Sequence, residues 1–76
     1  MTRHSLDCSG HLCPAPVLMT EETFLSLRAG DELEVLFTDK GAKLDLKMWC
    51  KAYGHEFVSY KDHRLTGTAL LRKIKD

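Results

Sequence analysis

The segment Cys13-Pro14-Ala15-Pro16 constrains the fold of this chain more than any other feature. Proline lacks a backbone N–H and has a fixed φ angle, so it is tolerated in the first turn of a helix but not deeper. Apolar residues follow the two prolines at helical spacing. The pattern predicts that an extended segment ends at Gly10 and that a helix begins around Pro14 to Pro16. This helix is expected to run through Leu27 and to be capped by Gly30.

Cys13 then lies at or just before the N-terminus of the predicted helix. The unpaired N–H groups and the positive end of the helix dipole at such a position favour an anion. We therefore expect the pKa of the Cys13 thiol to lie below its free value of about 8.5, with thiolate available at neutral pH. The same N–H groups are expected to hold an anionic sulfur species bound to Cys13.

Two half-buried strands are indicated by alternation of apolar and polar residues. The first contains Leu6 and Cys8, and the second contains Leu33, Val35 and Phe37. Because polar side chains alternate with these residues, one face of each strand is expected to lie on a core.

The spacing changes to that of an amphipathic helix between Asp39 and Gly54. Asp39 is interpreted as its cap, Asp45 as an acid of its first turn that complements the dipole, and Gly54 as its end. The predicted buried face consists of Leu46, Trp49, Cys50 and Tyr53.

Two further strands are predicted around Phe57 to Tyr60 and from Leu65 to Lys75. The resulting order β-α-β-α-β-β requires a mixed four-stranded sheet, and right-handed crossovers place both helices on one face. A chain of 76 residues is expected to form one domain over residues 1–76 with a thin core. The predicted class is α+β, with the architecture of a two-layer α/β sandwich.

The Cys-Pro-x-Pro segment, preceded by Gly10-His11-Leu12, resembles that of the TusA/SirA-like sulfur-carrier proteins. The resemblance covers nearly all of the chain. It extends to the segments Leu6-Asp7, Gly30-Asp31-Glu32-Leu33, Asp39 with Asp45-Leu46, Gly54-His55-Glu56 and Leu71-Arg72-Lys73. It implies the same two-layer architecture, similar to the C-terminal domain of bacterial translation initiation factor 3.

Several residues depart from the pattern of this family. Lysines occupy positions 40 and 47, where prolines are common, and Cys8 stands where a small or apolar residue is usual. Glu21 and Glu22 stand where basic residues are common. These changes leave the chemistry of Cys13 alone and bear on which partner docks.

The resemblance implies that Cys13 is the catalytic residue of a sulfurtransferase that accepts sulfane sulfur as a persulfide. The implied donor is a cysteine desulfurase or another persulfide-bearing protein, and the acceptor serves transfer RNA thiolation, sulfur oxidation or cofactor assembly. No bound cofactor is expected. The residues assigned to substrate or partner binding are His11, Pro14, Pro16, Glu21 and Asp45.

Composition limits the compartment and the partners. Three cysteines without a secreted disulfide framework, and apolar runs too short for a membrane span, predict a cytoplasmic protein without membrane contact. Residues 1–39 carry two basic and seven acidic side chains, and residues 40–76 carry nine basic and four acidic ones. With a formal net charge of zero, direct nucleic-acid binding is not expected. The one feature that indicates nucleic-acid binding is a basic group with Tyr60 beside it in the sequence. This group consists of Lys61, Arg64, Arg72, Lys73 and Lys75.

Other functions remain open for the cysteines and the sheet. Cys8 would resolve a modified Cys13 in a thiol-disulfide redox switch, although a core role is favoured for both Cys8 and Cys50. A metal site at His4, Cys8, His11 and Cys13 is not expected, because structural zinc sites use closely spaced ligand pairs. The remaining alternative is a module that binds RNA or protein, with Cys13 incidental.

Overall fold

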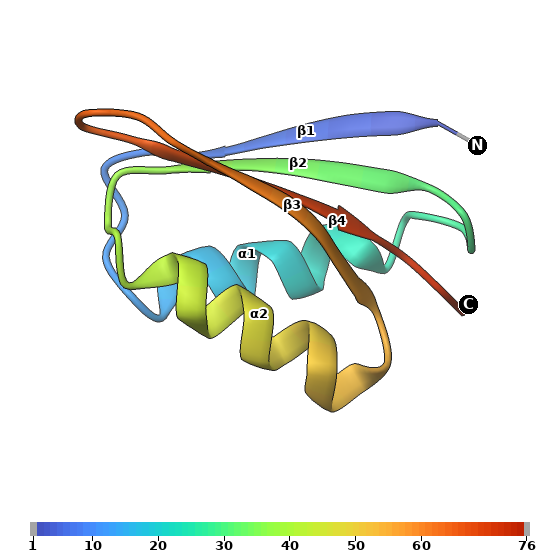
Figure 1. The fold of residues 1–76 in the computed structure, drawn as a ribbon. Coiled ribbons are helices and arrows are strands. Elements are labelled where there is room, and N and C mark those ends of the chain that lie inside the picture. The colour runs from blue at the N-terminus through green and yellow to red at the C-terminus, as the bar shows by residue number, and fades with distance from the viewer. Residues whose placement is uncertain (1, 76) are drawn as a thin grey trace.

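A computed structural model describes residues 2–75 of the chain. Its elements follow the predicted order, strand-helix-strand-helix-strand-strand (Figure 1). The elements are β1 (Arg3–Cys8), α1 (Ala15–Phe24), β2 (Glu32–Phe37), α2 (Ala42–Tyr53), β3 (Glu56–Asp62) and β4 (Gly67–Arg72).

The four strands form one mixed sheet in the order β1-β2-β4-β3. β1 and β2 are parallel, whereas β4 pairs antiparallel with both β2 and β3. Both helices cover the same face of the sheet (Figure 1). The predicted α+β class and two-layer architecture are therefore confirmed.

The core lies between the sheet and the helix layer. Leu33, Val35 and Phe37 of β2 are fully buried, and the residues between them are only half-buried, as the alternation predicts. Leu46 and Cys50 of α2 pack in the same apolar cluster. The strand alternation gives β2 one buried face, and the helical spacing gives α2 one buried face. These two faces pack against each other, so the sheet and the helices lie face to face.

The predicted end of the first helix is wrong. α1 ends at Phe24, and the next residues form a tighter turn in which the Leu27 N–H donates to the carbonyl of Phe24 at 3.1 Å. Gly30 does not cap the helix. Its φ of 95° belongs to the turn before β2, where its N–H donates to the carbonyl of Lys73 at 2.7 Å.

The predicted second helix is correct in its position but not at its cap. Gly54 ends α2 with a φ of 77°, as expected, but Tyr53 on the predicted buried face is 54% exposed. Gly41 is the N-cap residue just before α2, and no side-chain hydrogen bond caps the helix. Asp39 precedes the helix, and its carboxylate accepts the N–H groups of Gly41 and Cys13.

A row of alternating charges crosses the open face of the sheet. Arg3 of β1 pairs with Glu32 of β2 at 3.2 Å, and Arg72 of β4 pairs with Glu32 and with Glu56 of β3 at 2.7 Å each. Because the paired residues face one another in register, each charge in the row lies beside an opposite one. The predicted basic cluster is therefore divided, since Arg72 is neutralised on this face.

Lys73 is buried on the other side of the sheet. Its ammonium donates to the carbonyl oxygens of Phe24 and Leu27 at 2.7 Å each, so it holds the end of α1. The predicted final strand, drawn to Lys75, ends instead at Arg72. Lys73 is thus a structural residue and not part of an exposed basic surface.

We expect Lys73→Met to lower the free energy of unfolding by about 1–3 kcal/mol, because two buried carbonyl groups lose a charged donor. Methionine retains most of the apolar stem. Chemical denaturation monitored by circular dichroism measures the change, with the exposed Lys47→Met in α2 as the control. Equal stability of the two variants would contradict the role assigned to Lys73.

Candidate functional site

The sheet topology brings two loops together at the carboxyl ends of β1 and β2. β1 and β2 are parallel neighbours and each leads into a helix, so residues 9–14 and 38–41 both leave the carboxyl ends of adjacent strands. The N-termini of α1 and α2 lie side by side there (Figure 1). Cys13 stands in the first loop, and its side chain is exposed.

The Cys13 residue is held at both its backbone and its sulfur by acids of the second loop and helix. Its N–H donates to Oδ2 of Asp39 at 2.7 Å, and its thiol donates to Oδ2 of Asp45 in the first turn of α2. Asp39 also accepts a bond from the N–H of Gly41 at 3.0 Å. These N–H donors lower the pKa of the Asp39 carboxyl group, which stabilises its charged form.

The predicted low pKa of Cys13 is wrong in direction. The hydrogen bond to the Asp45 carboxylate stabilises the protonated thiol and raises its pKa, and desolvation adds to the effect. The negative charges of Asp45 and Asp39 then disfavour a second anion nearby. The bond to Asp45 and the nearby charge of Asp39 therefore favour the neutral form of the thiol.

The predicted cradle of free N–H groups is also wrong. The Cys13 N–H binds Asp39, the Ala15 N–H donates to Leu12 at 2.8 Å, and the Val17 N–H donates to Pro14 at 3.1 Å. Pro14 and Pro16 have no N–H to offer. The amides that open α1 are thus occupied, and they are not available to an anionic sulfur.

The prolines lie where the sequence predicts them. Pro14 is the N-cap residue just before α1, and Pro16 is buried in its first turn, where its carbonyl accepts the Thr20 hydroxyl at 2.8 Å. The Cys13–Pro14 peptide bond is cis. Together the two prolines define the backbone on which the Cys13 side chain is presented.

The other two predicted binding residues are not gathered at the sulfur. His11 is exposed in the loop, where its N–H donates to the carbonyl of Cys8 at 3.1 Å, and the described residues show no bond from its ring to Cys13. Glu21 lies further along α1 and lines a separate pocket at the other end of the helix layer. Of the predicted set, Asp45 makes the direct contact.

Cys8 and Cys50 both belong to the core. Cys8 ends β1 with no exposed surface, and burial raises its pKa, with the Asp7 charge adding to the shift. Cys50 lies on the buried face of α2, where burial raises its pKa to about 11. The core roles predicted for these two cysteines are confirmed.

The sequence reasoning missed the contacts of the two aspartates and the apolar surface beside Cys13. Parallel β-α units place consecutive helix N-termini together at the carboxyl ends of the strands. From this topology one could have predicted that Asp39 and Asp45 lie near Cys13. Leu12 is 75% exposed beside Cys13, and Leu18 of α1 is 57% exposed. These leucines offer apolar area near the thiol that is accessible to a partner.

Within residues 2–75, no three side chains of His, Cys, Asp or Glu gather in a way that would hold a metal ion. His4 instead lies 3.5 Å from the carboxylate of Asp31. No helix of these residues has the length and apolar character that crossing a bilayer requires.

The fold has a close counterpart among solved structures. The crystal structure of a SirA-like protein from Desulfitobacterium hafniense superposes with a TM-score of 0.81, covering 95% of this chain and 99% of that one. The sequence identity is 19%, so this likeness shows the fold alone.

Sequence comparison shows the family. The family model described as Sulfurtransferase TusA matches residues 4–73. The sulfur carrier protein TusA of Pseudomonas putida is 34% identical over 71 residues, which is 93% of this chain and 89% of that protein. YrkI of Bacillus subtilis is 44% identical over 57 residues, or 75% of this chain and 76% of that protein.

Other relatives are longer than this chain, which spans 29% of YrkF from Bacillus subtilis and 36% of a protein from Aquifex aeolicus. Both nonetheless match at 43% identity over the shared region. The resemblance to the TusA/SirA-like sulfur-carrier proteins is thereby confirmed. The chain belongs to the TusA family of sulfurtransferases, a family of sulfur carriers.

Proposed function

We propose that this protein carries sulfane sulfur as a persulfide on Cys13 and relays it to an acceptor protein. The observation that carries the proposal is the exposed thiol at the proline-started helix in a chain of this family. The two other cysteines are buried in the core, so Cys13 is the thiol that a partner can reach. Access and thiolate formation govern attack on a sulfur atom.

Asp45 supplies the proton acceptor for the loading step. As the donor persulfide approaches, the Cys13 thiol passes its proton to the carboxylate that already accepts its hydrogen bond. The Cys13 thiolate attacks the outer sulfur of the donor persulfide, a new S–S bond forms, and the donor S–S bond breaks. The departing donor thiolate takes the proton from Asp45, leaving a persulfide on Cys13.

The partners follow from this chemistry. The donor is a cysteine desulfurase or another protein that bears a persulfide, and the acceptor serves transfer RNA thiolation, sulfur oxidation or cofactor assembly. The exchange needs no cofactor bound to this chain, and it takes place in the reducing cytoplasm. Exposed Leu12 and Leu18 provide apolar contact area for these partners.

The test is mass spectrometry after incubation with a cysteine desulfurase and cysteine. The proposal expects a gain of one sulfur atom that maps to the peptide containing Cys13 and is removed by a thiol reductant. A protein whose mass stays unchanged while the desulfurase turns over would contradict it.

The same experiment separates two other functions. Loss of two hydrogens with a link between Cys8 and Cys13 would indicate a redox switch, but burial of Cys8 in the core disfavours it. An unmodified protein that retains RNA would indicate a binding module. The neutralised Arg72 and the buried Lys73 leave that module a smaller basic surface than the sequence suggested.

A further inference from the structure

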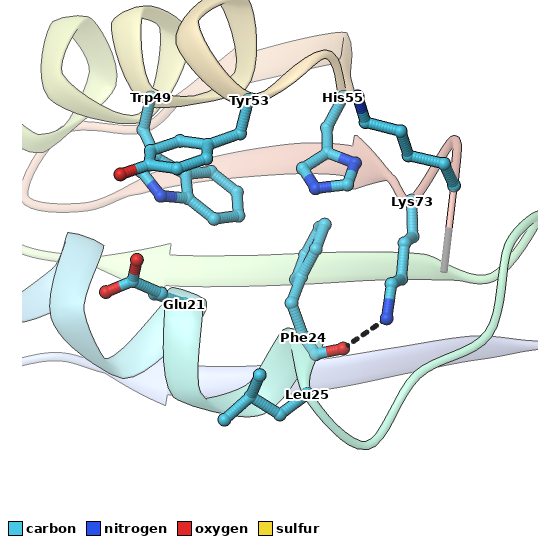
Figure 2. Close-up of a pocket in the computed structure, with 8 residues that line it drawn as sticks. Glu21, Phe24, Leu25, Trp49, Tyr53, His55 and Lys73 are labelled. Atoms are coloured by element: carbon cyan, nitrogen blue, oxygen red, sulfur yellow. Dashed lines mark hydrogen bonds between the residues drawn. The ribbon is translucent and has the colours of Figure 1, made fainter.

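A pocket lies between the C-terminal halves of α1 and α2 (Figure 2), whereas Cys13 precedes the N-terminus of α1. It has a volume of about 290 Å³. This is close to the lower limit for pockets that bind small molecules and is enough for a ligand of one or two rings. The loading chemistry at Cys13 makes no use of it.

The wall of the pocket is aromatic. The rings of Phe24 and Trp49 meet edge to face with centroids 5.0 Å apart, and the His55 ring lies 4.9 Å from Phe24 and 5.4 Å from Trp49. Tyr53 borders the same space, with its centroid 5.7 Å from that of Trp49 (Figure 2). Such a set of rings suits a flat aromatic body, which packs by stacking and edge contacts.

The aromatic wall also contains an unpaired donor. The indole N–H of Trp49 is buried and has no hydrogen-bond partner among residues 2–75. A buried donor without a partner is uncommon and calls for an acceptor. Figure 2 shows the indole nitrogen at the edge of the ring cluster, on the side of Glu21.

His55 contributes a ring N–H to the same wall. Its Nδ1 accepts the N–H of Ile74 at 3.2 Å, so the neutral ring carries its proton on Nε2. Burial, assisted by the charges of Lys73 and Lys75, lowers the pKa of His55 and stabilises this neutral form. One ring nitrogen of His55 points into the space bordered by Phe24 and Trp49 (Figure 2).

The charges around the pocket favour an anion. Lys73 and Lys75 line it against the single carboxylate of Glu21. The Lys73 ammonium is engaged by backbone carbonyls, but residues 2–75 contain no ion-pair partner for Lys75. Its Nζ lies near Gly54, at 3.4 Å from the place that a Cβ atom would take there.

We propose that this pocket binds a small planar aromatic carboxylate, with its ring packed against the aromatic wall and its carboxylate toward Lys75. The flat body matches the aromatic wall, and the anionic group matches the ammonium of Lys75, which has no ion-pair partner among residues 2–75. This site is independent of sulfur loading at Cys13, so either proposal can fail without the other.

The test uses benzoate as the ligand and nuclear magnetic resonance of the nitrogen-labelled protein. Trp49 is the only tryptophan, so its indole N–H gives one cross-peak that reports directly on the pocket. Benzoate is expected to shift this peak saturably at millimolar concentrations. Benzyl alcohol, which has the same ring without the charge, is expected to bind about tenfold more weakly.

Variants and a cationic analogue identify the source of binding. Lys75→Gln is expected to weaken benzoate binding several-fold, whereas Lys51→Gln, at an exposed position of α2 outside the pocket, leaves it unchanged. The proposal is overturned if benzoate gives no saturable shift, if benzyl alcohol binds as tightly, or if Lys75→Gln has no effect. Tighter binding of benzylamine would also overturn it and would assign the pocket to cations through Glu21.

Discussion

Replacement of Cys13 by serine is expected to abolish sulfur loading completely. A serine hydroxyl cannot form the S–S bond by which the sulfane sulfur is held, and the other two thiols lie in the core. Mass spectrometry after incubation with a cysteine desulfurase and cysteine measures the loss. Undiminished loading of Cys13→Ser would remove Cys13 from the proposed mechanism.

The loss should be chemical and not structural. The Cys13 side chain is exposed, and a serine hydroxyl can donate to Asp45 as the thiol does. Circular dichroism and the thermal midpoint of Cys13→Ser should therefore match those of the native protein. Cys8→Ala and Cys50→Ala serve as matched controls, since they remove the buried sulfurs and should still load one sulfur atom.

Much of the fold could be predicted because local patterns and topology agree. Alternation at Leu33, Val35 and Phe37 and helical spacing at Leu46 and Cys50 each mark a surface that must be buried. With two strands each followed by a helix, right-handed crossovers leave one arrangement of layers. Because the local patterns and the topology agree, the architecture can be predicted from the sequence alone.

The electrostatic state of Cys13 could not be predicted from its local position. The helix dipole is a property of α1 alone, whereas Asp39 and Asp45 come from the following loop and helix. Asp45 accepts a hydrogen bond from the Cys13 thiol and Asp39 one from its amide, and the carboxylates raise the pKa of the thiol. The structural role of Lys73 could not be predicted for a related reason, because only the folded chain places its ammonium at the end of α1.

Substitution of Asp45 by asparagine is expected to make Cys13 more reactive as a thiol. The carboxylate raises the pKa of Cys13 by accepting its proton in a hydrogen bond and by its charge. Asparagine removes the charge and can donate an N–H to a thiolate, so the pKa should fall toward its ordinary value. The rate of alkylation by iodoacetamide at neutral pH should rise several-fold, and the midpoint of its pH profile should move to lower pH.

Sulfur loading should respond in the opposite direction if Asp45 accepts the proton during transfer. Asp45→Asn then gains thiolate in the free protein but loses the group that returns a proton to the departing donor thiolate, so loading by the desulfurase slows while alkylation accelerates. Glu56→Gln removes the same charge from the open face of the sheet, where it pairs with Arg72, and should change neither rate. If Asp45→Asn accelerates alkylation and loading together, Asp45 only suppresses the thiolate of the free protein and takes no part in the transfer.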